Sequence, residues 1–114
     1  MQRSNKQTRG RNAVEAAFQG WLKMQDCCVS GEYGVQVHHC EGSAFKHNKV
    51  LIGHWFCIPL SVGKHKEYHS GTKAFRGNYG PQSLFWIVLH DLYVDDGNDP
   101  APDDVIDSIM DWGR

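Results

Sequence analysis

Histidine is the residue type with the most potential for chemistry in this chain of 114 residues, which contains seven of them. His38 and His39 follow the alternating run Tyr33–Val37, which predicts a half-buried strand. Adjacent residues on a strand point to opposite faces, so one imidazole can face a metal ion while the other reaches a different part of the same cleft. An adjacent histidine pair is more often exposed polar surface, so the pair alone does not define a site.

A second histidine pair stands in the segment HKEYH, where His65 and His69 are four residues apart. Residues 61–69 predict a short helix that ends before Gly71 and has Ser61 as its N-cap. This spacing puts both imidazoles on one face of the helix, one turn apart, where they can bind one divalent cation. In zinc proteases a Glu directly follows the first His, whereas here Glu67 lies about 200° around the helix from His65, which disfavours a protease.

The elements that must position these histidines follow from periodicity and turn residues. In chain order they are a helix over 13–25, a strand ending at His39, a loop from 42 to 48, an antiparallel strand over 49–58 ended by Pro59, the helix over 61–69, a turn over 77–81, a buried helix over 82–93, and a linker over 97–102 before a terminal helix. Asn12 and Glu15 predict a capping box for the first helix. The core of the helix over 82–93 is expected to contain Leu84, Trp86, Ile87, Val88 and Leu89.

The length of the chain is typical of one domain, and its charge is unevenly distributed. Residues 1–94 carry 11 Lys and Arg against 6 Asp and Glu, a net charge of +5, whereas residues 95–114 carry one Arg and seven Asp, a net charge of −6. We therefore expect a flexible basic arm over 1–12, a folded domain over 13–94, and an acidic linker and terminal helix over 95–114. A basic body is compatible with phosphate contacts, from which the acidic end would point away.

Membrane and export signals are not evident. No apolar run approaches the roughly 18–20 residues that span a bilayer, and the first 12 residues have no apolar stretch typical of a signal peptide. We expect a cytoplasmic protein with no membrane partner, in which the four cysteines are thiols or metal ligands rather than disulfides.

The order of four short motifs adds a resemblance to a known family. VQVHHCEG, FCIPLSVGKH, HKEYH and FRGNYG, within about residues 26–80, resemble the ββα-metal (HNH) nucleases of phage and prophage recombination, and most closely the Ref-type RecA-dependent nucleases. The resemblance implies an α+β fold: a small ββα-metal core with a two-stranded antiparallel sheet and a metal-bearing helix, flanked by N- and C-terminal helices. It also implies that His38, His65 and His69 bind the metal and that His39 is the general base.

The function implied by this resemblance is a divalent-metal-dependent DNA endonuclease that acts in recombination in a bacterial host cell. Three protein ligands leave coordination positions open for a phosphate oxygen and the departing 3′ oxygen. Imidazole suits Zn²⁺, Ni²⁺ and Mn²⁺ better than Mg²⁺, so the identity of the one expected ion stays open among these four. Neutral imidazole is available for His39 near pH 7 because its ordinary pKa is about 6.5.

The chain departs from the family at a second metal site. Many HNH domains hold a structural zinc through two C-x-x-C pairs, whose counterparts here are Cys27 with Ser30 and Ser61 with Lys64. We therefore expect no structural zinc. Aromatic packing by Trp21, Trp55 and Trp86 should hold the elements together instead, and Cys28, Cys40 and Cys57 should be buried thiols.

Two further sets of residues complete the expected site. Phe56 stands where the family has its middle Asn, so His54 and Asn48 are the candidates for orienting the loop. Basic side chains around the metal-bearing helix are candidates for phosphate contacts: Lys64, Lys66, Lys73 and Arg76. No segment resembles a base-reading helix, so DNA binding should be largely independent of sequence, with a recombinase filament as a further partner suggested by the resemblance.

Two other functions stay open from the sequence. In one, the protein is a non-catalytic DNA-binding module that assists recombination, and its histidines hold a structural metal. In the other, it is a structural or protein-interaction protein that acts through its basic arm and acidic terminal helix. Buried imidazoles need partners, and a shared metal ion would supply one to all three ligands, which favours the nuclease.

Overall fold

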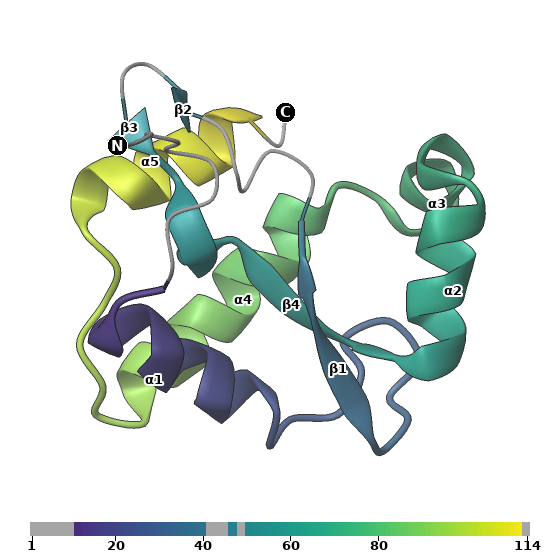
Figure 1. Ribbon diagram of the computed structural model, residues 1–114, viewed down its shortest axis with the longest axis horizontal. Coiled ribbons are helices and arrows are strands. Elements are labelled where there is room, and N and C mark those ends of the chain that lie inside the picture. Colours follow the sequence, from purple (N-terminus) through teal and green to yellow (C-terminus); the bar gives the residue numbers. More distant parts are fainter. Residues whose placement is uncertain (1–10, 41–45, 48–49, 113–114) are drawn as a thin grey trace, which may run out of the picture.

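The computed structural model describes residues 11–40, 46–47 and 50–112 (Figure 1). The described part of the chain contains five α-helices and two small antiparallel sheets, one pairing β1 with β4 and the other pairing β2 with β3. The elements are α1 (Ala13–Leu22), β1 (Val35–His39), β2 (Lys46–His47), β3 (Val50–Leu51), the 3-10 helix η2 (Gly53–Trp55), β4 (Cys57–Ser61), α2 (Val62–Ser70), α3 (Thr72–Tyr79), α4 (Gln82–Asp95) and α5 (Asp103–Trp112). The expected α+β class is confirmed.

The unit β1–β4–α2 positions all four motif histidines. β1 and β4 pair so that His38 lies opposite Ile58 and His39 opposite Cys57. α2 follows β4 without a loop, and its N-cap Ser61 accepts a hydrogen bond at Oγ from the backbone N–H of Lys64 at 3.2 Å. Capping at this point turns the chain directly from strand into helix, so α2 packs back against β1 and β4.

The second strand is shorter and later in the chain than the sequence predicts. Instead of one strand over 49–58, β3 ends at Leu51, η2 follows, and β4 begins at Cys57. Gly53 has a φ of 66°, which allows the chain to turn there. Pro59 lies inside β4 rather than at its end; in a two-stranded sheet every strand has a free edge, where the missing N–H of proline costs little.

Two other boundaries differ from expectation. α1 ends at Leu22 instead of residue 25, with Met24 and Gln25 donating backbone hydrogen bonds to Trp21 and Leu22 in a final turn. Part of the expected loop over 42–48 is β2, which pairs with β3. Residues 1–10 of the expected basic arm lie outside the described residues, as does Asn48.

Helix α3 was not predicted, because Gly77 and Asn78 are typical of a turn. The helix instead continues through both residues and ends at Gly80, which has a φ of 89°. Phe75 is buried, with its ring centroid 5.6 Å from that of Tyr68 on α2 and 4.7 Å from that of Tyr79. This packing outweighs the cost of a glycine in an exposed helix, about 1 kcal/mol.

The core is organised around aromatic rings, as expected. Phe18 is fully buried, and its ring contacts those of Trp21, Trp55, Trp86 and Tyr93. In α4 the residues facing the core are Ser83, Trp86, Leu89, His90 and Tyr93. The prediction that Leu84 and Val88 belong to the core is wrong: both are exposed, because an almost continuous apolar run has no periodicity to identify its buried face.

The acidic end of the chain folds onto the body. α5 packs against α4 and β3, and its residues Val105 and Ile109 are buried. Figure 1 places this helix on the side of the molecule away from α2 and α3. None of the helices in the described ranges has the length and apolar character of a membrane span.

Candidate metal centre

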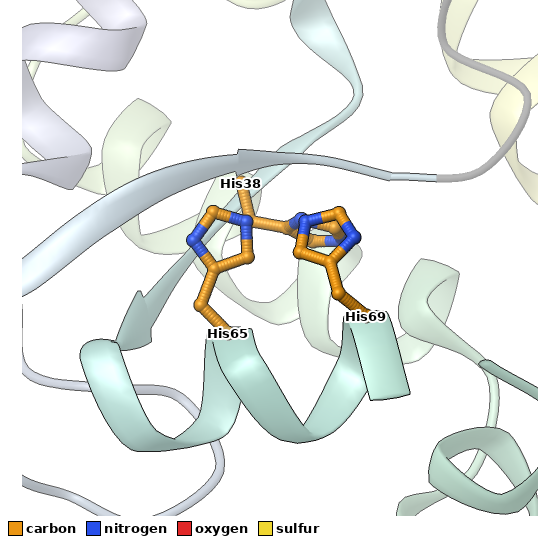
Figure 2. A group of neighbouring side chains, drawn as sticks. All are labelled: His38, His65 and His69. Carbon is orange, nitrogen blue, oxygen red and sulfur yellow. The ribbon is translucent and has the colours of Figure 1, made fainter. Parts of the chain in front are cut away.

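Three of the motif histidines converge on one point. His38 from β1 and His65 and His69 from α2 offer ring nitrogens that all lie within 4.8 Å of one another, the one group among the described residues that could hold a metal ion. Figure 2 shows the two helix imidazoles side by side, with the His38 ring reaching toward them from the strand above. Ligands about 2.0–2.1 Å from a shared zinc ion in tetrahedral geometry are about 3.4 Å apart, so a movement of about 1 Å would close the site.

The electrostatic setting favours neutral imidazoles at this cluster. His38 is 2% exposed. Burial first, and then the nearby His65 and His69, lower its pKa to about 4. Burial and the neighbouring His69 also lower the pKa of His65. Because a metal ion binds the unprotonated ring, these shifts keep the cluster ready for a cation near neutral pH.

Two glutamine side chains contact the cluster. The Oε1 atom of Gln36 lies 2.8 Å from Nδ1 of His65, and because an amide oxygen only accepts, Nδ1 donates and Nε2 of His65 keeps its lone pair for a metal. Gln82 donates from Nε2 to Nε2 of His38 at 3.4 Å, a long contact for a buried ring. The imidazole of His38 is therefore weakly partnered by the protein, which fits a role as a ligand.

A cleft opens beside the cluster. It has a volume of about 490 Å³ and is lined by Gln36, Val62, His65, Lys66, His69 and Ser70. Two of the three converging histidines therefore face a space that is accessible from solvent. An ion at this position could be reached by a substrate, unlike an ion enclosed on all sides.

His39 lies outside the three-histidine cluster, as the strand alternation predicts. Its ring is exposed, and its Nε2 is 2.9 Å from Nδ1 of His54 in η2. The pKa of His39 is lowered by burial first, then by the nearby His54 and Arg11, while Glu15 raises it. His39 is thus a neutral imidazole next to, but separate from, the candidate ligands.

The four basic candidates for phosphate contacts have different environments. Lys66 lines the cleft and is exposed. Lys64 instead donates from Nζ to Oε1 of Glu67 and to the hydroxyl of Tyr79, both at 2.9 Å. Lys73 and Arg76 are exposed on α3. The geometry favours Lys66 as the phosphate contact nearest the cluster.

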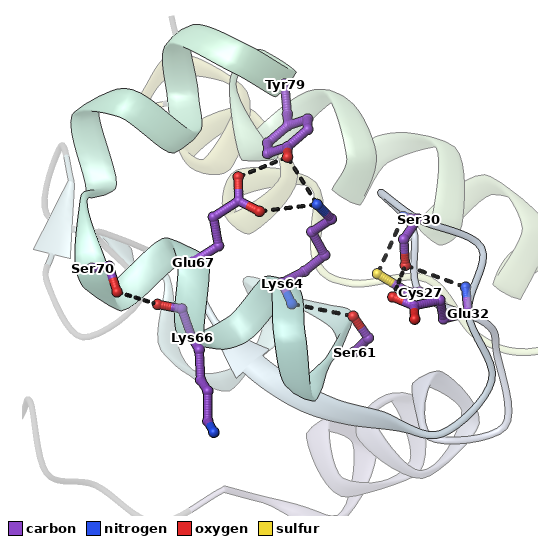
Figure 3. Close-up of polar contacts among 9 residues, drawn as sticks. All are labelled: Cys27, Ser30, Glu32, Ser61, Lys64, Lys66, Glu67, Ser70 and Tyr79. Atoms are coloured by element: carbon purple, nitrogen blue, oxygen red, sulfur yellow. Dashed lines mark hydrogen bonds and ion pairs between the residues drawn. The ribbon is translucent and has the colours of Figure 1, made fainter.

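The residues that correspond to the structural zinc ligands of HNH domains lie together on the opposite side of α2 (Figure 3). They are Cys27, Ser30, Ser61 and Lys64. The Sγ atom of Cys27 accepts the backbone N–H of Ser30 at 3.4 Å. Burial alone would raise the pKa of Cys27, but hydrogen bonds from the Ser30 side chain and from the backbone of Ser30, Ser61 and Val29 lower it to about 7. One thiol among two hydroxyls and an ammonium is a poor ligand set for zinc.

Several contributors to the site were not found by sequence reasoning. Gln36 precedes His38 by two residues, so strand alternation could have placed it on the same face. Gln82 and Tyr68 had no such signal: Gln82 is brought in by the start of α4, and the ring centroid of Tyr68 is 4.3 Å from that of His38. Glu15 and Gln19, which are buried in α1 and bond the backbone of His54, were also missed, because their partners are more than 30 residues away.

Taken together, the fold and site define a small α+β protein with a three-histidine cluster at the junction of a strand pair and a helix. A family model described as "Protein of unknown function (DUF968)" matches residues 3–97, and the chain belongs to this family. The match covers the cluster, His39 and His54 and ends before α5. Neither a search of curated proteins nor a search of solved structures found a match.

Proposed function

We propose that this protein is a divalent-metal-dependent DNA endonuclease of the HNH type, acting in phage or prophage recombination within the bacterial cytoplasm. The observation that carries the proposal is the convergence of His38, His65 and His69 from two elements, with the fourth motif histidine adjacent but outside the cluster. Packing alone gives no reason to gather three imidazoles and so to lower the pKa of His38 and His65, whereas a shared cation does.

In this proposal His38, His65 and His69 hold the ion. The donor set fits because all three ligands are imidazoles, because His65 has its second nitrogen bonded to Gln36, and because the pKa of His38 is lowered to about 4. When bound, the ion supplies Lewis-acid stabilisation to the charge that develops on a phosphodiester during hydrolysis.

His39 acts as the general base. Its exposed ring is accessible to water, and its lowered pKa keeps the imidazole unprotonated at neutral pH. General bases of this kind contribute about 10²–10⁴-fold to the rate. The separation of His39 from the ligand set lets it accept a proton without competing with the metal for the same electron pair.

The cleft and its charge favour a polyanionic substrate. Lys66 lines the cleft beside His65 and His69, where its ammonium group can contact a phosphate next to the scissile one. Because no segment of the sequence resembles a base-reading helix, backbone contacts would dominate and sequence preference would be weak.

The test is cleavage of plasmid and single-stranded DNA by the full chain with Mg²⁺, Mn²⁺, Zn²⁺, Ni²⁺ or a chelator. We expect nicking with at least one ion and none with the chelator. His39→Ala should lower kcat by about 10²–10⁴-fold while leaving metal affinity unchanged. The matched control is Tyr33→Ala, which removes a side chain that is 93% exposed and lies outside the cleft.

Two results would reject the proposal. Nicking by His39→Ala at the rate of the unmodified protein would contradict the role of His39. DNA binding and metal binding without cleavage under any of the four ions would instead indicate the non-catalytic recombination module with a structural metal.

A further inference from the structure

The ring of His39 is joined to a second imidazole that is not part of the metal cluster. Nε2 of His39 lies 2.9 Å from Nδ1 of His54, with the ring centroids 5.1 Å apart and the ring planes at 83°. A distance of 2.9 Å is typical of an N–H···N hydrogen bond, so one of the two nitrogens carries the proton and the other accepts it.

His54 is held in place by its backbone, independently of its ring. Glu15 Oε2 accepts the backbone N–H of His54 at 3.1 Å, and Gln19 Nε2 donates to the backbone carbonyl of His54 at 3.0 Å. Glu15 and Gln19 are 2% and 3% exposed. Cys57 Sγ also donates to this carbonyl, at 3.2 Å. Buried side chains of α1 therefore fix η2, and η2 presents the His54 ring to β1.

The Glu15 side chain is itself anchored. Its Oε1 accepts the backbone N–H of Asn12 at 2.8 Å, while the Asn12 side chain accepts the backbone N–H of Glu15 at 2.9 Å, which completes a capping box. The carboxylate therefore links the start of α1 to the backbone of His54. This frame fixes the backbone position from which the His54 side chain reaches His39.

The direction of the ring-to-ring hydrogen bond decides whether His39 can be a base. Since Nε2 is engaged with His54, the nitrogen left to accept a proton is Nδ1, on which the described residues place no hydrogen bond. Nδ1 is basic only if Nε2 carries the proton and donates it to Nδ1 of His54. The opposite direction would put the proton of His39 on Nδ1 and leave no acceptor facing water.

We propose that His54 is a positioning residue for the nuclease reaction, accepting a hydrogen bond at Nδ1 from Nε2–H of His39 and so holding His39 in the tautomer whose Nδ1 is free to act as base. This inference rests on the proposed function of His39. In the step that follows, the oxygen of water bonds to phosphorus, the bond from phosphorus to the 3′ oxygen breaks, and the water proton moves to Nδ1 of His39. The leaving oxygen takes its proton from solvent.

In other enzymes a histidine base is also oriented by a partner that is hydrogen-bonded to its second ring nitrogen. That partner selects the tautomer and stabilises the protonated ring. Here the partner is an imidazole rather than a carboxylate, so its contribution is orientation and a single hydrogen bond. Loss of His54 should therefore cost less than loss of His39 itself.

The first experiment reads the tautomer directly. Long-range ¹H–¹⁵N spectra of the full chain with ¹⁵N-labelled histidine, recorded metal-free and with Zn²⁺, should give a protonated Nε2 and an unprotonated Nδ1 for His39. His54→Phe, which keeps a ring but removes the acceptor, should convert this signal to a mixture of tautomers. A proton on Nδ1 of His39 would overturn the inference, as would a second equivalent of Zn²⁺ whose binding His54→Phe removes.

The second experiment uses cleavage kinetics. His54→Phe should lower kcat about 10-fold with KM and metal affinity unchanged, and His54→Asn, whose amide oxygen can accept near the position of Nδ1, should recover part of the loss. In a His39→Ala background, His54→Phe should have no further effect, since the two residues act as one unit. Equal losses in both backgrounds would overturn the inference.

The two experiments separate this inference from the function on which it rests. If the unmodified protein cuts no DNA, the nuclease proposal fails even when the tautomer is as stated. If it cuts DNA while His39 carries its proton on Nδ1, the nuclease proposal survives and the role of His54 fails. If His54→Phe does not fold, the tautomer of the unmodified protein and the His54→Asn kinetics still decide the question.

Discussion

The two faces of helix α2 differ in how they can accommodate positive charge. One face carries His65 and His69, which meet His38 in a cluster of three imidazoles (Figure 2). The other carries Lys64 and Glu67, which meet the hydroxyl of Tyr79 on α3 (Figure 3). The histidine face is suited to an ion from solution, whereas the lysine face contains a cation supplied by the chain.

The pKa shifts on the two faces have different causes. Burial and neighbouring histidines lower the pKa of His38, so the ring resists a proton. Hydrogen bonds to Tyr79 and Glu67 raise the pKa of Lys64, and hydrogen bonds from Tyr79 and Lys64 lower that of Glu67, so both stay charged. The lowered pKa values and converging ring nitrogens of the histidine face favour the proposed metal site, while the matched charges of the lysine face are typical of a structural contact.

The largest effect is expected from removing a histidine on the α2 face that carries His65 and His69. His69→Ala should lower Zn²⁺ affinity by more than about 100-fold and remove cleavage activity, because two remaining imidazoles bind an ion far less tightly than three. Saturating Zn²⁺ should raise the Tm of the unmodified protein by about 10 °C at 100-fold excess over Kd. That rise should be absent in His69→Ala.

The control for this comparison is Lys64→Met on the other face of the same helix. It removes the ammonium group but leaves all three imidazoles, so Zn²⁺ affinity should stay within about 2-fold and the rise in Tm should be kept. A comparable loss of Zn²⁺ affinity in both variants would mean that the two faces are not functionally distinct.

An intermediate effect is expected from pH in the metal-free protein. The unfolded chain binds a proton at His38 below its ordinary pKa of about 6.5, whereas the folded chain resists it until about pH 4. The stability due to neutral His38 is therefore present above pH 6.5 and lost as pH falls toward 4, by roughly 3 kcal/mol at most. Urea unfolding at pH 7.5, 5.5 and 4.5 measures this loss.

His38→Asn isolates the contribution of His38 to that acid loss, because other histidines with lowered pKa, such as His65 and His90, titrate in the same direction and remain present. The variant should lose less stability between pH 6.5 and 4 than the unmodified protein. Identical dependence of the free energy of unfolding on pH in the two proteins would show that His38 does not carry the shift.

The smallest effect is expected on the lysine face. Tyr79→Phe removes the hydroxyl that accepts from Lys64 and donates to Glu67 at 2.7 Å, but the ring can still pack on Phe75. Because the network is partly solvated, Tm should fall by only about 2–4 °C. Thermal unfolding measures this, and Zn²⁺ affinity should not change; a change in affinity would indicate that the two faces are coupled through α2.

The sequence predicted the relative positions of the four motif histidines better than it predicted the elements around them. The spacing of His65 and His69 and the alternation of His38 and His39 are local rules, and the structure places these side chains as those rules require. Their roles as ligands and base stay predictions. The boundaries of β4 and the existence of α3 could not be predicted, because the φ of Gly53 and the packing of Phe75 depend on contacts that are distant in sequence.

The same limit applies to the residues that support the site. His54 was expected to orient a loop, but its hydrogen bond to His39 depends on Glu15 and Gln19 in a helix more than 30 residues earlier. No local pattern links these positions. The docking of the acidic terminal helix against α4 and β3 likewise depends on the buried side chains of Val105 and Ile109.

The most direct test of the central claim is a titration of the metal-free full chain with Co²⁺, followed by its visible absorption. We predict one bound equivalent with the spectrum of an ion that has nitrogen ligands, displaced by Zn²⁺, lost in His65→Ala/His69→Ala and kept in Lys64→Met. Absence of a bound equivalent in the unmodified protein, or an unchanged spectrum in His65→Ala/His69→Ala, would contradict the three-histidine centre on which the proposed function depends.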